Sequence, residues 1–299
     1  MLNIKETLTL KNKNVREQIT AYTFLLPALI AFTLFKYYPI AEGFFISFFN
    51  IDIVNLPGTF VGFDNYIRAF TDVKFYSALM NNLWFLIYGT AMTFWPPILL
   101  ALFINEVVRG KTIMRLFYFI PAVAPGMAVA ILFKYIWQPD YGLANYILSL
   151  FHIAPQMWLN DSKLVYFCMM TPGMILSGGM NMLIYLAAMQ GIPPEHYEAA
   201  MLEGAGFFKR FFSITLPQIK NVIGMMYIID VIARFNEINS PLVMTGGGPA
   251  GATETLILYA YKQATNSLDY SYAITMANIV FVIIFIITAF QMKMTRKED

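Results

Sequence analysis

Charged residues are scarce in this 299-residue chain: Asp, Glu, Lys and Arg make up only 13% of it, against roughly 25% in an average soluble domain. Hydrophobic residues make up 58%, and the mean hydropathy is +0.58. A chain of this composition cannot present the polar surface that a soluble globular protein needs. We therefore expect an integral membrane protein.

Groups that carry catalysis or hold metals are equally rare. The single cysteine, Cys168, lies in an apolar run, which excludes a disulfide within the chain. The two histidines, His152 and His196, have no second ligand at metal-binding spacing. The sequence contains no G-x-x-x-x-G-K-[ST] phosphate loop and no recognisable catalytic triad or nucleic-acid groove. We therefore do not expect an enzyme, a metal or cofactor held by this chain, or a nucleic-acid partner.

Six segments are long and apolar enough to cross a bilayer, which takes about 20 residues. They are residues 19–45, 79–104, 113–137, 164–189, 217–238 and 270–292. The first exceeds the apolar region of a signal peptide, so we expect it to be retained. The expected fold class is all-α and integral to the membrane, with a six-helix domain at 19–292 between an N-terminal segment, 1–18, and a tail, 293–299.

Breakers interrupt three of these spans, at Pro96-Pro97, at Pro121 with Pro125-Gly126, and at Thr171-Pro172-Gly173. Such breaks persist in lipid only where neighbouring protein or a watery cavity satisfies the freed backbone groups. The spans should therefore pack as a bundle.

Basic residues in short loops indicate the orientation, because they accumulate on the cytoplasmic side. One side holds thirteen: Lys5, Lys11, Lys13, Arg16, Arg109, Lys111, Arg115, Lys209, Arg210, Lys220, Lys293, Arg296 and Lys297. The other side holds four: Arg68, Lys74, Lys163 and Lys262. Both termini should therefore be cytoplasmic.

The stretch Glu195–Lys220 lies between two strongly apolar spans, yet it is charged and too short to cross a bilayer. Pro193-Pro194 suits the entry to a helix beginning near Glu195, since a missing N–H costs nothing in the first turn. Gly204 then interrupts the helix. The pattern predicts a helix, a turn and a second short helix that ends near Pro217.

This element could rest on the inner leaflet, but surface helices usually present Lys and Arg to anionic lipid. Here Glu195, Glu198 and Glu203 make the helix acidic. The small side chains of Ala199 and Ala200 would let a partner backbone approach closely. We therefore expect a soluble cytoplasmic partner to dock on it.

The spacing E-A-A-x-x-x-G-x(9)-I-x-L-P runs from Glu198 to Pro217 and resembles the EAA loop of the membrane subunits of binding-protein-dependent ABC importers, here residues 190–217. Three further segments are similar to carbohydrate permeases of the maltose-transporter type: 60–66, 186–193 and 245–249 with Thr253. Two positions depart from the family pattern. Glu203 stands where Asp is usual, and Asn221 replaces a common proline, which removes the usual cause of a kink at the start of the fifth span.

The resemblance implies the type I permease fold of ABC importers, with a coupling helix seated in a cleft of a cytoplasmic ATPase. It places the coupling contact at Glu195, Glu198, Ala199, Ala200, Glu203, Gly204 and Pro217. The partners it implies are a second related permease, two ATPase subunits that use ATP and Mg²⁺, and an extracytoplasmic solute-binding protein. The location would be the cytoplasmic membrane of a prokaryote, crossed several times.

Ionisable groups inside a span are costly and are candidates for function. Lys36 and Lys134 lie near span ends, where snorkelling accounts for them. In the fifth span Asp230 and Arg234 share a helical face, and Glu237 should continue it one turn on. Two interpretations stay open: Asp230 and Arg234 neutralise each other, or Arg234 lines the pathway and binds an acidic group with its planar fork.

In the resembled permeases, sugar is held midway across the membrane by the fourth and fifth spans. Carried over without gaps, that site falls at Gly173, Leu176, Ser177, Met180, Asp230, Ala233 and Arg234, to which the helical face adds Glu237. These residue types differ from those of the maltose protein, so a location is implied but not a ligand. Phe235 and Tyr185 would suit a sugar ring, whereas Gly173, Ser177 and Gly178-Gly179 equally suit close helix packing.

We therefore expect the permease subunit of an ATP-driven importer that moves a carbohydrate by alternating access. An oligosaccharide is the expected cargo, and one containing uronic acid would explain Arg234. The alternative is an ion-coupled secondary transporter that uses Asp230 or Glu237 as its ion site. Such carriers often contain repeated halves, and no repeat is recognisable here.

Overall fold

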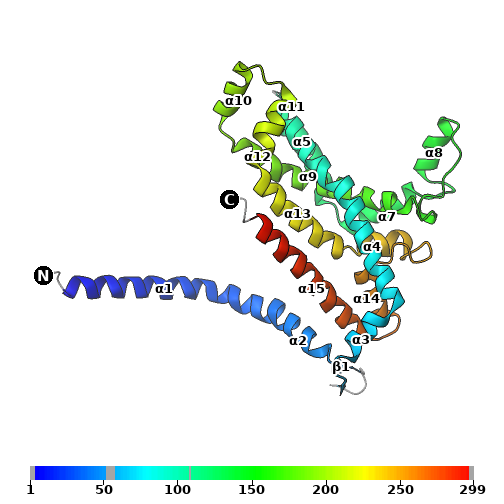
Figure 1. The fold of residues 1–299 in the computed structure, drawn as a ribbon, viewed down its shortest axis with the longest axis horizontal. Helices are drawn as coiled ribbons and strands as arrows, with labels where there is room; N and C mark the ends of the chain where they lie inside the picture. The colour runs from blue at the N-terminus through cyan, green and yellow to red at the C-terminus, as the bar shows by residue number, and fades with distance from the viewer. Residues whose placement is uncertain (1–3, 52–57, 108, 296–299) are drawn as a thin grey trace.

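The computed structural model describes residues 4–51, 58–107 and 109–295 and is largely helical (Figure 1). Residues 1–3 of the expected N-terminal segment and 296–299 of the expected tail, with Arg296 and Lys297, lie outside the described residues. The main helices of the apolar spans are α1 (Ile4–Phe32), α2 (Tyr38–Ile46), α4 (Val73–Gly89), α5 (Trp95–Glu106), α6 (Lys111–Phe119), α7 (Gly126–Ile136), α9 (Val165–Gln190), α13 (Lys220–Phe235) and α15 (Tyr270–Thr295).

Other elements connect these helices. They are α3 (Asp64–Thr71), α8 (Leu143–Leu150), α10 (Pro194–Leu202), α11 (Phe207–Arg210), α12 (Leu216–Gln218), α14 (Leu256–Thr265) and the 3₁₀ turns η3 (Ile120–Val123) and η4 (Trp158–Asn160). Four π-helical segments are η1 (Thr33–Tyr37), η2 (Thr90–Phe94), η5 (Phe211–Thr215) and η6 (Pro241–Thr245). One antiparallel pair, β1 (Phe49–Asn50) with β2 (Thr59–Phe60), sets Phe49 opposite Phe60.

The six expected spans coincide with the apolar helices of the structure. Four straight stretches are long and apolar enough to cross a membrane: Gln18–Ile46, Val73–Glu106, Val165–Gln190 and Tyr270–Lys293. Two bent pairs complete the six if each counts as one span: Lys111–Val123 with Gly126–Ile136, bent by 93°, and Phe207–Gln218 with Lys220–Phe235, bent by 71°.

Three of the π-helical segments end two residues before a proline, at Pro39, Pro96 and Pro217. A proline has no N–H for the carbonyl four residues back, and its ring pushes that carbonyl aside. The turn widens instead of breaking, so that the N–H of Leu216 bonds to the carbonyl five residues back, at Phe211. The second span therefore stays continuous through Pro96-Pro97.

Pro172 does not interrupt α9, contrary to the expected break. The carbonyl that loses its normal donor is that of Cys168, four residues earlier, and the Thr171 hydroxyl donates to it instead. Trp137 Nε1 in turn donates to Thr171 Oγ1 at 3.0 Å. A threonine next to the proline thus satisfies the freed carbonyl, as it can in membrane helices. At Pro121 and Pro125 the helix does break, into α6 and α7.

The start of the fifth span is kinked although Asn221 replaces the usual proline. The kink lies at Ile219, where the chain leaves helical geometry with φ −97° and ψ 6°. Ile219 is 1% exposed and belongs to the apolar core around α5 and α9. The bend therefore lies at a residue that is packed into this core.

The first span stands apart from the bundle, as Figure 1 shows for α1. Its apolar window is 0% buried within the chain, whereas those of the other straight spans are 33% to 44% buried. Contact with the bundle is made by α2, where Asn278 Nδ2 donates to Gly43 O at 3.0 Å and Phe44 packs on Phe281. An apolar helix of this kind requires lipid or another subunit to cover it.

A hydrogen-bonded cluster joins α4, α14 and α15 at the end of the bundle that should face outward. Tyr259 and Tyr272 donate to Asp72 Oδ2 at 2.6 and 2.7 Å, and Lys74 N donates to Asp72 Oδ1 at 2.8 Å. Partial burial alone would raise the pKa of Asp72, but the hydrogen bonds from Tyr259, Tyr272 and Lys74 hold that pKa below its usual 3.8.

We expect Asp72→Asn to lower the free energy of unfolding at pH 6 by on the order of 1 kcal/mol, because the bonds lose a charged acceptor. A lowered folded-state pKa stabilises the fold above pH 3.8, and this contribution is lost as the pH falls through the folded value. Thermal unfolding in detergent between pH 6 and pH 3 measures both proteins. The stabilities of the wild type and of Asp72→Asn should converge toward pH 3. A stability difference that stays constant from pH 6 to pH 3 would contradict the charge-based explanation.

Candidate functional site

The predicted coupling loop has the expected form of two helices joined by a turn. α10 begins at Pro194 and ends at Leu202. After the turn, α11, η5 and α12 continue from Phe207 to Gln218. The second helix thus passes through Pro217 and ends one residue later. In Figure 1 the loop lies at the end of the bundle beyond α5 and α9.

A glycine closes α10. Gly204 has φ +77°, a left-handed conformation that glycine adopts without strain. Its N–H donates to Met201 O at 3.0 Å, and the N–H of Ala205 donates to Ala200 O at 2.9 Å. These two bonds form the Schellman closure of a helix C-terminus, so the shape of the turn is specified locally.

The surface of the loop is uncovered in this chain. Among the predicted coupling residues, Glu195, Glu198, Ala199, Glu203, Gly204 and Pro217 are exposed and Ala200 is partly buried. Large apolar side chains accompany the acids: Leu202 is 91% exposed and Phe208 is 72% exposed. Because this surface carries exposed apolar side chains as well as acids, we expect it to bind in a cleft of another protein and not to remain in contact with water.

The inner side of the loop is attached to the bundle. Tyr197 Oη and Thr215 Oγ1 are 2.9 Å apart, which ties α10 to η5. Arg210 Nη2 lies 3.7 Å from Glu106 Oε2 at the end of the second span. A displacement of α10 would therefore be transmitted to the spans.

The ion pair between Asp230 and Arg234 forms, and it is buried. Arg234 Nη2 and Nε donate to Asp230 Oδ1 at 2.8 and 3.2 Å, with both side chains less than 10% exposed. Arg234 Nη2 also donates to Thr93 Oγ1 of η2, and Thr93 donates to Gly89 O at 2.8 Å. Asp230 Oδ2 is buried and has no hydrogen-bond partner among the described residues.

Gly89 provides the space for the arginine. A Cβ at this position would lie 2.6 Å from both Cδ and Nε of Arg234, well inside van der Waals contact. The absence of a side chain lets α4 approach the guanidinium closely. Neither Gly89 nor Thr93 could be identified beforehand, because no local pattern relates the second span to the fifth.

A small cavity of about 50 Å³ brings several predicted residues together. Of the predicted substrate residues, Gly173, Leu176, Arg234 and Glu237 line it, and residues that were not predicted, Gly126, Met169, Met170, Asn239 and Ser240, complete the wall with Pro172. This volume holds one or two water molecules. A sugar could enter only if the spans separated.

The other predicted positions are placed differently. Ser177 donates to Gly173 O at 2.6 Å, next to the cavity. Met180 is 54% exposed, and Ala233 is also exposed. These two side chains are available to a neighbouring subunit or to a pathway outside the chain.

The expectation that Glu237 continues the helical face of Arg234 is wrong. α13 ends at Phe235, where the side chain of Asn236 donates to Ile232 O at 2.8 Å. Glu237 instead accepts a hydrogen bond from the backbone N–H of Ser240 at 2.9 Å, ahead of η6. The local competition from these two side chains ends the helix, although Glu237 still reaches the cavity through the loop.

Packing decides the roles of the two aromatic residues that would suit a sugar ring and of the small-residue seam in α9. Tyr185 and Phe235 are 0% and 1% exposed and belong to apolar cores, so they offer no face to a sugar. In the small-residue seam, a Cβ on Gly179 would lie 2.2 Å from Tyr118 O. Close packing of α9 against α6 therefore accounts for Gly179.

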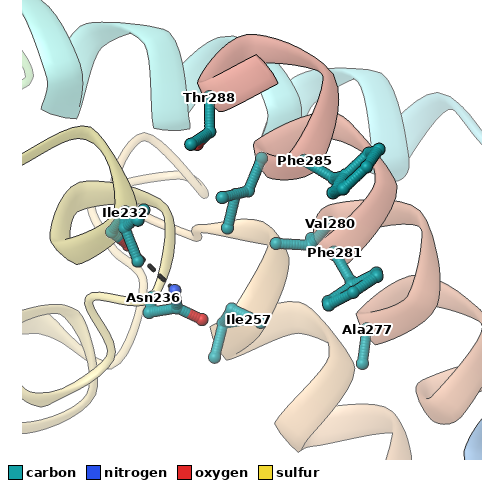
Figure 2. Close-up of a pocket in the computed structure, with 9 residues that line it drawn as sticks. Ile232, Asn236, Ile257, Ala277, Val280, Phe281, Phe285 and Thr288 are labelled. Carbon is teal, nitrogen blue, oxygen red and sulfur yellow. Dashed lines mark hydrogen bonds between the residues drawn. The ribbon is translucent and has the colours of Figure 1, made fainter. Parts of the chain in front are cut away.

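A larger groove of about 470 Å³ runs between α13, α14 and α15 (Figure 2). Apolar side chains line most of it, including Phe281 and Phe285 of α15 and Ile257 of α14, with the amide of Asn236 at one edge. No charged residue is among its described lining residues. It is therefore a less suitable site for a polar cargo than the region around Arg234.

Comparisons with known proteins agree with this architecture. A family model described as the binding-protein-dependent transport system inner membrane component matches residues 97–297. A probable ABC transporter permease of Bacillus subtilis, YurN, is 33% identical over 290 residues, covering 95% of this chain and 99% of its own length. The sulfoquinovosyl glycerol transport system permease SmoG of Agrobacterium fabrum is 30% identical, covering 95% of this chain and 92% of its own.

The trehalose/maltose transport system permease MalF of Thermococcus litoralis is 31% identical over 282 residues, covering 94% of this chain and 95% of its own. Among solved structures, a chain of a bacterial ABC transporter involved in the import of the acidic polysaccharide alginate superimposes with a TM-score of 0.83. It is 24% identical, and the match covers 95% of this chain and 98% of that chain. At this identity the likeness concerns the fold.

Proposed function

Since this chain belongs to the family of inner membrane components of binding-protein-dependent transport systems and is an ABC transporter permease, we propose that it imports an oligosaccharide by alternating access. Two relatives at 30% and 31% identity are named for the transport of sugar-containing cargo, which supports a carbohydrate. The family membership argues against the alternative of an ion-coupled carrier that uses Asp230 or Glu237.

The observation that carries this proposal is the uncovered coupling loop. α10 carries Glu195 and Glu198 on an exposed surface, while Tyr197 ties α10 to η5 and Arg210 pairs with Glu106 of the second span. We assign its outer surface, including Ala199, Ala200, Glu203 and Gly204, to the cleft of an ATPase subunit. ATP and Mg²⁺ would be bound by that subunit, and its closure would move α10 and the second span together.

The remaining partners follow from surfaces that this chain leaves uncovered. The first span, Gln18–Ile46, is 0% buried, and Met180 and Ala233 point out of the chain. A second permease would cover these residues and complete the pathway between the two subunits. A solute-binding protein would deliver the cargo from outside, with α10 and both termini in the cytoplasm of a prokaryotic cell.

The buried charges would select the cargo. Asp230 and Thr93 hold the guanidinium of Arg234 beside a small cavity that Gly173, Leu176 and Glu237 also line. When the spans separate, a carboxylate on the sugar would take the place of Asp230 at the guanidinium. The cargo proposed is therefore an oligosaccharide with at least one acidic residue.

We expect uptake by the reconstituted complex to depend on ATP and not on ion gradients. The complex would be placed in proteoliposomes with its solute-binding protein, and labelled oligosaccharide uptake measured. Omitting ATP should abolish uptake, whereas ionophores that collapse proton and sodium gradients should leave it unchanged. Uptake that persists without ATP and is lost with the ionophores would establish the ion-coupled alternative.

A further inference from the structure

The hairpin that joins the third and fourth spans is free of charge over a long stretch. Residues 141–160, which include α8 and η4, contain no Asp, Glu, Lys or Arg. By the distribution of basic residues, this connection lies on the outer side of the membrane. Figure 1 shows α8 standing out from the end of α7, apart from the helices of the bundle. The hairpin should therefore lie at the outer surface of the bilayer.

One face of α8 is apolar and exposed. With about 100° between successive residues of a helix, five side chains share a face about 140° wide. Each of them is between 45% and 70% exposed. They are Leu143, Tyr146, Ile147, Leu150 and, at the C-terminal end, Phe151. A contiguous exposed face of this kind marks a site that binds a membrane or another protein.

The polar groups of the hairpin are turned inward and are satisfied there. Asn145 is buried on the opposite face of α8, where its Nδ2 donates to Pro139 O at 2.8 Å and to Gln156 O at 2.9 Å. Its Oδ1 accepts from Gln156 N at 3.0 Å and from Trp158 Nε1 at 2.7 Å. All four hydrogen-bonding positions of this amide are thus used inside the hairpin. Polar groups inside and apolar side chains outside suit a hydrocarbon surface better than water.

The exposed face of α8 continues from the third span. Ile131, Leu132 and Tyr135 of α7 are exposed apolar residues of that span. Tyr141 and Tyr146 follow and are exposed as well. Tyrosine is enriched where the hydrocarbon core of a bilayer meets the head groups. The apolar face of α8 therefore continues the exposed apolar surface of the third span at the level expected for that boundary.

We propose that α8 lies in the outer leaflet, with its apolar face between the head groups and the acyl chains. Free interfacial helices usually need basic residues to reach a membrane. α8 is attached to the end of a span, so its local concentration at the membrane is high without them. A solute-binding protein must dock and leave, and such reversible interfaces are about as polar as the rest of a protein surface. This face offers little beyond the Tyr146 hydroxyl, so lipid is the partner we favour.

The contacts of the hairpin connect this membrane anchor with the candidate substrate site. Trp158, bound to Asn145, packs on Trp137 at the end of the third span, with the ring centroids 4.7 Å apart. Trp137 Nε1 donates to Thr171 Oγ1 at 3.0 Å, next to Pro172 in the wall of the small cavity. Anchoring of α8 would therefore hold the outer part of the third span against α9 beside that cavity. The inference depends on neither the cargo nor the ATPase subunit.

Spin labels on the complex in lipid nanodiscs test this proposal. Leu150→Cys places a label in the apolar face, and Ile147→Cys provides a second position there. Ser149→Cys, close in size to the native residue, is the matched control at an exposed position about 100° around the helix from Leu150. The wild type gives the background, because its single cysteine, Cys168, is 0% exposed.

The measurement is the collision rate of each label with oxygen, which dissolves in hydrocarbon, and with a water-soluble nickel chelate. The solute-binding protein is left out at first and then added. We expect the ratio of oxygen to nickel collisions to be about tenfold higher at Leu150→Cys and Ile147→Cys than at Ser149→Cys, because the apolar face of an interfacial helix is buried in the head-group and acyl boundary. Adding the solute-binding protein should leave these ratios unchanged.

Each other outcome overturns the proposal. Equal ratios at Leu150→Cys and Ser149→Cys would show that α8 does not lie at a boundary between lipid and water. Low collision rates with both oxygen and nickel at Leu150→Cys would show that another subunit covers the face. Nickel collisions that are lost when the solute-binding protein is added would assign the face to that protein.

Discussion

A Glu198→Lys variant is expected to reach the membrane in normal amounts and to lose its ATPase subunits. Glu198 is exposed on α10, whereas Tyr197 holds α10 to η5 and Arg210 pairs with Glu106 of the second span, so the substitution leaves the internal contacts of the fold intact. We expect the ATPase cleft to present a basic residue to Glu198, so a lysine at this position would juxtapose like charges, which costs several kcal/mol. Co-purification of the ATPase should fall by about a hundredfold or more, and uptake should fall with it.

The measurement is the ratio of ATPase to permease after affinity purification, together with thermal unfolding of the permease. Asp140→Lys is the matched control: it reverses an exposed charge on the side of the chain predicted to face outward, and should leave the ratio unchanged. For Glu198→Gln, the ratio of ATPase to permease should lie between those of the wild type and Glu198→Lys, because this substitution removes the attraction without adding repulsion. Wild-type complex yield and uptake in Glu198→Lys would refute the docking contact.

A photo-crosslinker at Ala199 provides an independent check on the same surface, since this side chain is exposed and small. Capture of a second polypeptide is the expected result. Capture of phospholipid alone would support the alternative in which α10 rests on the inner leaflet.

The second large effect is expected at Arg234. Arg234→Ala removes the guanidinium and leaves Asp230, 7% exposed, as a buried charge without its partner, which costs about 3–5 kcal/mol. Expression should therefore fall. Uptake of an acidic oligosaccharide should fall a further 10- to 100-fold relative to a neutral one of equal length, the loss expected for a hydrogen bond between charged groups.

The double variant Asp230→Ala, Arg234→Ala separates these two effects. Removing both partners eliminates the unpaired buried charge, so expression should recover. If Arg234 binds the acidic group of the cargo, uptake of the acidic oligosaccharide stays low in the double variant while uptake of the neutral one recovers. Equal recovery of uptake for both sugars would show that Asp230 and Arg234 form only a structural ion pair. It would refute the proposal of an acidic cargo.

Much of this architecture could be predicted from local pattern. Apolar length alone located the six spans, because about 20 residues of hydrocarbon must be crossed whatever the neighbours are. The glycine and prolines around α10 specified helix, turn and helix through backbone conformation. The four-residue separation of Asp230 and Arg234 on one helix made their pairing one of the two interpretations left open. Each of these properties depends on a few neighbouring residues.

Predictions failed where side-chain hydrogen bonds to the backbone, or packing between helices, decide the result. Pro172 resembles the breakers at Pro121 and Pro125, yet α9 stays straight because Thr171 satisfies the freed carbonyl of Cys168. Glu237 lies one turn beyond Arg234 in sequence, but side-chain hydrogen bonds end the helix first. Tyr185 looked accessible to a sugar and is fully buried.

The sequence by itself therefore determined the membrane location, the apolar segments of the spans, the shape of the acidic loop and the shared helical face of Asp230 and Arg234, since all are set by composition or by contacts within a few turns. The tertiary structure alone decided that Gly89 and Thr93 surround Arg234, that the first span stays uncovered and that a small cavity forms beside Arg234. These features depend on which helix faces meet across long stretches of chain, and residue spacing within one helix carries no information about that.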